Sequence, residues 1–115
     1  QIHDSTSSLN KPLIRLVWLR EYNGVFNHYW AVVKNAASAS SSDYSRYDLG
    51  AWSSLPMNFE LQVQSNTMKV KVNNATKVSK DVSYWEDYPS YFKAGVYNQD
   101  SGTGKTQFKS LKYYD

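Results

Sequence analysis

With 115 residues, of which 41% are hydrophobic and 20% charged, the chain has the size and composition of one soluble globular domain. It contains no cysteine, which excludes a disulfide scaffold and thiolate chemistry, and no apolar run of roughly 18 residues, which argues against a membrane-spanning helix. The net charge of +3 is a mild basic excess that suits a polyanionic partner better than duplex DNA.

The chain begins with a short alternating segment. Successive side chains of a strand point to opposite faces, so Ile2 is expected on one face and Gln1 and His3 on the other. His3 is a candidate general base, because imidazole titrates near neutral pH. A single histidine near a chain end is more often incidental, and these residues alone leave both interpretations open.

Two runs of strand length follow. Residues 13–19 are largely apolar on both faces, which predicts a central strand covered on both sides. Asn23-Gly24 is a strong turn pair, and residues 25–34 are rich in β-branched and aromatic residues, so the two runs predict a hairpin. His28 is expected to be structural, because no second His, Cys or carboxylate accompanies it at metal-ligand spacing.

Residues 35–45 are rich in serine and alanine and predict an exposed loop or a lid over a cleft. Residues 58–64 and 67–72 then alternate between apolar and polar positions around Ser65-Asn66, which predicts an antiparallel hairpin with one solvated face. Asn73-Asn74 closes this unit, and residues 75–89 predict a short strand followed by a loop. The inward positions are Phe59, Leu61, Val63, Met68, Val70 and Val72. The basic positions nearby, usually a solvated face but also suited to meeting carboxylates, are Lys69, Lys71, Lys77 and Lys80.

The stretch YFKAGVYNQD at residues 91–100 predicts a strand that lines a site. Its alternation gives one oily face and one polar face, the latter carrying Tyr91, Lys93, Gly95, Tyr97 and Gln99. Gly95 leaves room for a ligand against the backbone between Lys93 and Tyr97. Lys93 and Tyr97 are also compatible with ordinary strand-surface positions.

A glycine-rich turn at residues 100–105 and a last strand at residues 106–114 are expected to complete the chain. No segment shows capped ends with a sustained helical period. Many short strands joined by Gly, Asn and Ser turns favour a sandwich or jelly roll.

The motifs QIH at residues 1–3 and YFKAGVYNQ at residues 91–99 together resemble the jelly-roll alginate lyases, polysaccharide lyase family seven and the closely related family eighteen. The resemblance implies an all-β fold, an antiparallel β-sandwich jelly roll of the concanavalin-like type. Family members carry a third motif upstream of QIH, of the form Arg-(Ser/Thr)-Glu-(Leu/Val)-Arg, which this chain lacks. The resemblance therefore implies that residues 1–115 are a single domain, the C-terminal portion of the lyase fold, with the upstream strands and the Arg motif supplied by a second chain or segment.

The resemblance also implies a secreted enzyme that depolymerises alginate by β-elimination in guluronate or mannuronate blocks, leaving unsaturated uronate ends. Carried over by position, Gln1 would hold the carboxylate, His3 would be the base for guluronate, and Tyr97 would give a proton to the leaving oxygen. The implied substrate-binding residues are Lys93, Tyr91 and Gln99. No metal or organic cofactor is implied, and the expected partner is alginate, with no nucleic acid and no membrane.

Two alternatives are compatible with the same residues. One is a non-catalytic polysaccharide-binding module of the same fold, and the other is a glucuronan lyase. Replacing Tyr97 with Phe separates enzyme from module, because an enzyme loses turnover and keeps binding. A panel of polyguluronate, polymannuronate and glucuronan separates the two lyases. Ile2 between Gln1 and His3 resembles the enzymes that accept guluronate.

Overall fold

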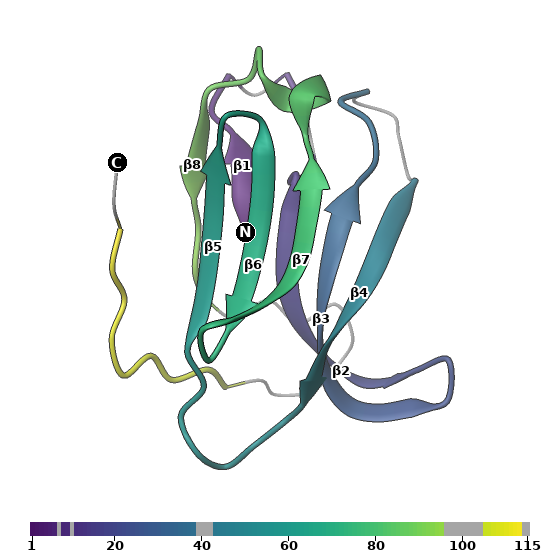
Figure 1. Cartoon of the computed structure of the whole chain (residues 1–115), viewed down its shortest axis with the longest axis vertical. Coiled ribbons are helices and arrows are strands. Elements are labelled where there is room, and N and C mark those ends of the chain that lie inside the picture. Colours follow the sequence, from purple (N-terminus) through teal and green to yellow (C-terminus); the bar gives the residue numbers. More distant parts are fainter. Residues whose placement is uncertain (7, 10, 39–42, 96–104, 114–115) are drawn as a thin grey trace.

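The structure, a computed structural model, describes the chain except residues 7, 10, 39–42, 96–104 and 114–115. Within the described residues, five strands form one antiparallel sheet in the order β4-β3-β2-β1-β8, and three form a second in the order β5-β6-β7. The two sheets lie face to face (Figure 1), so the predicted all-β antiparallel sandwich is confirmed. No helix of the described residues is long and apolar enough to cross a membrane.

The elements have the following bounds. The first sheet contains β1 (Ile2–Asp4), β2 (Ile14–Tyr22), β3 (Val25–Lys34), β4 (Tyr44–Ala51) and β8 (Ser90–Phe92). The second sheet contains β5 (Phe59–Gln64), β6 (Thr67–Val72) and β7 (Ala75–Asp81), followed by a 3₁₀ turn, η1 (Ser83–Trp85).

The predicted two-residue turns all form. Asn23 and Gly24 join β2 to β3 with φ values of 51° and 78°, and Ser65 and Asn66 join β5 to β6 with φ values of 50° and 60°. Positive φ at both central residues matches the right-handed twist of the flanking strands. These turns set the register of both hairpins, and Asn73-Asn74 does the same between β6 and β7.

The hydrophobic core lies between the two sheets. Ile14 and Val33 of the first sheet and Met68 and Val70 of the second are fully buried there. The predicted inward positions on β6 are therefore confirmed. On β5 the inward face is less well covered, since Phe59 and Leu61 are half-buried and Val63, which lies opposite the buried Met68, is 44% exposed.

The core also encloses the side chain of Lys34, at the end of β3. Its Nζ makes no hydrogen bond to the described residues and lies 5.8 Å from the centroid of the Trp85 ring. Burial, and then the charge of Lys11, lower the pKa of this ammonium group.

Two expectations about the first sheet are wrong. Strand β4 begins at Tyr44, so the loop expected over residues 35–45 ends earlier, and Leu49 of β4 is buried in the core. Strand β2 does lie in the middle of the sheet, but it is not covered on both sides along its length. Ile14 is buried, whereas Trp18 is 49% exposed.

Strand β8 is shorter than the strand expected from residue 91 onward. It covers Ser90–Phe92, and residues 93–95 are not in a strand, while residues 96–100 of the motif lie outside the described part of the chain. The prediction of a last strand at residues 106–114 is wrong for residues 106–113, the part of this range that the structure describes. They contain no strand, and Figure 1 shows this yellow segment running outside both sheets. An alternating sequence forms a strand only where a partner backbone takes its hydrogen bonds.

Candidate active site on strands β1 and β8

Strands β1 and β8 bring the two sequence motifs together. His3 lies opposite Tyr91 in the antiparallel ladder, and their rings stack with centroids 5.6 Å apart and planes 20° apart. The pairing continues one residue further, because the backbone N–H of Lys93 donates to the carbonyl oxygen of Gln1 at 3.0 Å. The backbone nitrogen of Gln1 in turn donates to the carbonyl oxygen of Lys93 at 3.0 Å.

Gln1 and His3 form a hydrogen-bonded pair at the edge of this ladder. His3 Nε2 lies 2.9 Å from Gln1 Oε1, and both side chains are half-buried. Because the amide oxygen accepts, Nε2 carries the proton in this arrangement, and Nδ1 keeps the free lone pair of a base. The predicted alternation is confirmed, since Ile2 between them is buried.

The surroundings of His3 favour its neutral form. Burial is the largest cause that lowers its pKa below the ordinary value of 6.5, followed by the charge of Lys93. A positive charge nearby disfavours a second one on the ring. His3 is therefore unprotonated near pH 7, as a general base must be.

Asp4 fixes the end of β1 directly after His3. Its buried carboxylate accepts backbone N–H groups from Thr6 at 2.8 Å and from Ser8 and Leu9 at 3.0 Å, and the Thr6 hydroxyl also donates to it. Burial alone would raise the pKa of Asp4, but the bonds from Thr6, Leu9 and Ser8 outweigh it and hold the pKa below 3.8. Asp4 was not among the residues predicted for the site, although an Asp followed by Ser and Thr is typical of a side-chain-closed turn.

Arg15 is a second residue that the sequence analysis missed. Ile2 and Ile14 form a cross-strand pair in the core, so Gln1, His3 and Arg15 point to the opposite, outer face of the sheet. Arg15 is half-buried, and no carboxylate of the described residues lies within ion-pair distance of it. A guanidinium in such a place is suited to bind a carboxylate through two hydrogen bonds.

The structure thus assembles four of the six residues predicted for the site: Gln1, His3, Tyr91 and Lys93. Tyr97 and Gln99 lie outside the described residues, so their placement stays a prediction. His28 is on the same outer face but further along the sheet, opposite Leu19, with Nδ1 2.8 Å from Asp48 Oδ1. The described residues hold no group of three His, Cys, Asp or Glu that would bind a metal.

The comparisons with known proteins all match alginate lyases. The sequence model of the family described as alginate lyase matches residues 1–115. An alginate lyase of Photobacterium sp. is 35% identical over 126 aligned positions, which cover 94% of this chain and 44% of the relative. The solved structure of the alginate lyase AlyC3 matches with a TM-score of 0.80 and 32% identity, covering 86% of this chain and 46% of that one. AlyC3 in complex with dimannuronate matches with a TM-score of 0.80 and 30% identity.

The chain spans about half the length of the relatives it matches, 44% of the Photobacterium protein and 46% of AlyC3. The structural likeness extends over both sheets, so the sandwich is of the jelly-roll class. Because the family match covers every residue, from QIH to the end of the chain, the protein belongs to the alginate lyase family.

Proposed function

We propose that the protein is a polysaccharide lyase that depolymerises alginate by β-elimination. The observation that carries the proposal is the hydrogen-bonded pair of Gln1 and His3, held beside Lys93 by the β1–β8 ladder in a chain of the alginate lyase family. An amide, a neutral imidazole and an ammonium group on one sheet face are the groups that an acidic sugar requires for this reaction.

The chemistry explains why these groups belong together. The proton removed is on the carbon that bears the carboxylate, and it is barely acidic while the carboxylate keeps its full charge, because the developing carbanion adds more charge. Hydrogen bonds and cations aimed at the carboxylate stabilise that charge as it forms. The amide of Gln1 and the guanidinium of Arg15 are placed on the correct face for this task.

The proton and electron movements then balance within the site. His3 takes the proton, the electron pair left on carbon forms the new double bond, and the bond to the glycosidic oxygen breaks. By its place in the family motif, Tyr97 gives a proton to that oxygen. The products are a polymer with a new reducing end and a polymer with an unsaturated uronate end.

We also propose the finer assignment to polysaccharide lyase family seven or eighteen, supported by the QIH and YFKAGVYNQ motifs. Two observations bear on the block that is cut. AlyC3 has been solved with dimannuronate, whereas Ile2 between Gln1 and His3 resembles the enzymes that accept guluronate. Initial rates on polyguluronate, polymannuronate and glucuronan decide between these substrates.

A partner segment or chain is part of the proposal. Large apolar side chains are exposed between and beside the sheets, including Trp18, Leu55 at 73% and Val63. Patches of this kind on a sandwich mark surfaces that another segment covers. We propose that strands corresponding to the remaining length of the relatives cover them. We also propose that the enzyme is secreted, since its polymeric substrate lies outside cells.

The test is the absorbance of unsaturated uronate ends during incubation of the full-length natural protein with alginate. We expect product from the wild type and a loss of about 10²- to 10⁴-fold on polyguluronate for His3→Ala, because a general base contributes this much. His28→Ala is the matched control and should stay within about twofold, since His28 lies five residues along β3 from Val33, the residue paired with Ile14 next to β1, and is bonded to Asp48. A folded wild type that binds alginate without forming any product would instead identify a binding module.

A further inference from the structure

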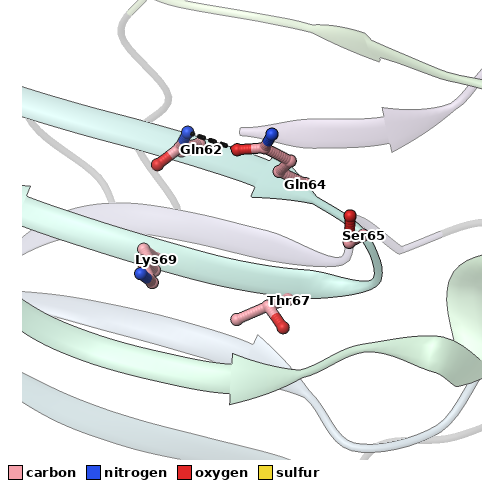
Figure 2. A pocket seen from close by; sticks show the side chains of 5 residues that line it. All are labelled: Gln62, Gln64, Ser65, Thr67 and Lys69. Atoms are coloured by element: carbon pink, nitrogen blue, oxygen red, sulfur yellow. Dashed lines mark hydrogen bonds between the residues drawn. The ribbon is translucent and has the colours of Figure 1, made fainter.

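A second polar pocket lies on the outer face of the other sheet. It has a volume of about 250 Å³ and is lined by Gln62 and Gln64 of β5, Ser65 of the turn, and Thr67 and Lys69 of β6. Figure 2 shows the two glutamines along β5 with Thr67 and Lys69 on the neighbouring strand. The candidate active site faces outward from the first sheet and this pocket faces outward from the second, with the hydrophobic core between the sheets.

The hairpin holds this pocket in a fixed shape. Gln62 lies opposite Lys69 and Gln64 opposite Thr67, so these polar side chains form a two-by-two array on one face. Met68 and Val70, which alternate with them on β6, are fully buried on the other face. The tight turn at Ser65, with positive φ, closes one end of the array. A one-residue slip of either strand would bury these polar groups, so the array is strongly specified.

The hydrogen-bonding groups are already oriented toward a ligand. Gln62 Nε2 donates to Gln64 Oε1 at 3.1 Å, which fixes both amides. This bond leaves the amide N–H groups of Gln64 as donors and the carbonyl oxygen of Gln62 as an acceptor. The hydroxyl groups of Ser65 and Thr67 in the lining can each donate and accept, as sugar hydroxyl groups require.

The positive charge in the pocket lining favours an acidic sugar over a neutral one. Lys69 is the only ionisable residue in its lining, and no carboxylate of the described residues lies within ion-pair distance of it. Two acidic residues share this face but lie outside the lining, since Glu60 pairs across from Lys71 and Asp81 pairs across from Thr67. The pocket therefore presents one cation among neutral polar groups.

We propose that this pocket is a second, non-catalytic carbohydrate site, in which Lys69 binds the carboxylate of a uronate residue and the amides of Gln62 and Gln64 bind its hydroxyl groups. The choice of a uronate rests on the proposed function, whereas the pocket itself does not. The lining of the pocket contains none of the residues of the candidate active site. The pocket holds polymer near the enzyme without taking part in the reaction.

The experiment uses the full-length natural protein carrying His3→Ala, which binds polymer without consuming it, and measures its retardation in gels containing polyguluronate or polymannuronate. We expect Gln62→Ala and Lys69→Gln each to weaken binding by about tenfold, the effect of losing one hydrogen bond to a charged or tightly held group. Lys71→Gln is the matched control, because Lys71 lies on the same strand and face, outside the pocket lining, and its substitution changes the net charge equally. Its effect should stay below about twofold.

Two results would overturn the proposal. Equal losses for Lys69→Gln and Lys71→Gln would show that only the overall charge attracts the polymer. Unchanged side-chain amide NMR signals of Gln62 and Gln64 on addition of oligouronate, with the fold intact by circular dichroism, would show that the pocket stays empty.

Failure of this site and failure of the proposed lyase function are distinguishable. With His3 present, Lys69→Gln should leave the turnover of a uronate trisaccharide unchanged, while slowing the turnover of dilute polymer. If no lyase activity is detected but oligouronate still perturbs the Gln62 and Gln64 signals, the pocket stands and the lyase function fails.

Discussion

The chemistry of His3 depends on three immediate neighbours. Tyr91 stacks on its ring, the amide of Gln1 accepts from its Nε2, and Lys93 lies close enough to lower its pKa. Each of these contacts is made by a different residue, so each can be removed by a separate substitution. Lys93 is the most informative of the three, because its removal changes an electrostatic field and leaves the ring packing in place.

Lys93→Gln should raise the pKa of His3, since the charge that disfavours protonation is removed. In the wild type the pKa lies below the ordinary 6.5, so the imidazole gains its proton only in mildly acidic solution, and in the variant it gains it at higher pH. An NMR titration of the His3 ring protons measures this directly, with His28 as the internal control. An unchanged His3 midpoint would contradict the assigned role of Lys93.

Asp4→Asn should lower the melting temperature by several degrees at pH 7, because a neutral amide accepts the bonds from Thr6, Ser8 and Leu9 less strongly. The pKa of Asp4 is lower in the folded state than the ordinary 3.8, so its stabilisation is complete above that value and is lost as the pH falls through the folded pKa. The wild type should therefore lose more stability than the variant between about pH 4 and pH 2.

Thermal scans over this range measure the effect, with Asp87→Asn as the control at an exposed carboxylate. Parallel loss of stability in the wild type and Asp4→Asn would show that Asp4 does not anchor β1.

Sequence reasoning reached part of this detail. The alternation around Ile2 predicted that Gln1 and His3 share a face, because that follows from strand geometry alone. The bond between their side chains, and the position of Arg15 on the same face, depend on which strands become neighbours. Tyr97 and Gln99 stay predictions.

At the scale of elements, turns and buried alternation were the reliable signals. The Asn-Gly and Ser-Asn turns and the apolar positions of β6 predicted both hairpins, because each signal is local. Strand β4 was missed because its sequence, YSRYDLGA, mixes charged and small residues, and only its pairing with β3 makes it a strand. For the opposite reason, the strand expected at residues 106–114 is absent from its described part, residues 106–113. No neighbouring strand accepts and donates backbone hydrogen bonds there.

Met68→Ala should destabilise the protein by about 2–5 kcal/mol, the usual cost of emptying a fully buried site. Val63→Ala, on the paired position of β5, is the matched control and should cost less than about 1 kcal/mol because the side chain is exposed. Midpoints of urea unfolding measure both. Equal costs would mean that the core does not lie between the sheets at this position.

The molecule as a whole exposes more apolar surface than a finished sandwich does. Trp18 and Trp52 are each about half exposed, at 49% and 48%, while Trp30 and Trp85 are buried. The relatives are about twice as long as this chain, which agrees with the proposal that further strands cover these indoles. Composition and strand pattern predicted the sandwich, but they could not show which of its faces remain open.

Covering strands should protect these two indoles from solvent. We expect the fluorescence of residues 1–115 alone to be strongly quenched by acrylamide, and the quenching constant to fall at least about twofold when the upstream half is added. Trp18→Phe with Trp52→Phe should remove that difference, since the remaining indoles are buried in both states. A difference that persists in this double variant would place the partner elsewhere.

The central claim is that Gln1 and His3 act as one unit on the uronate. Its most direct test is a double-mutant cycle on the rate at which unsaturated uronate ends form from polyguluronate, using the full-length natural protein with Gln1→Ala, His3→Ala and both. Groups that act together give non-additive losses, so we predict that the double variant is about as slow as His3→Ala alone, roughly 10²- to 10⁴-fold below the wild type. Losses that multiply, or a His3→Ala protein as fast as the wild type, would contradict the account.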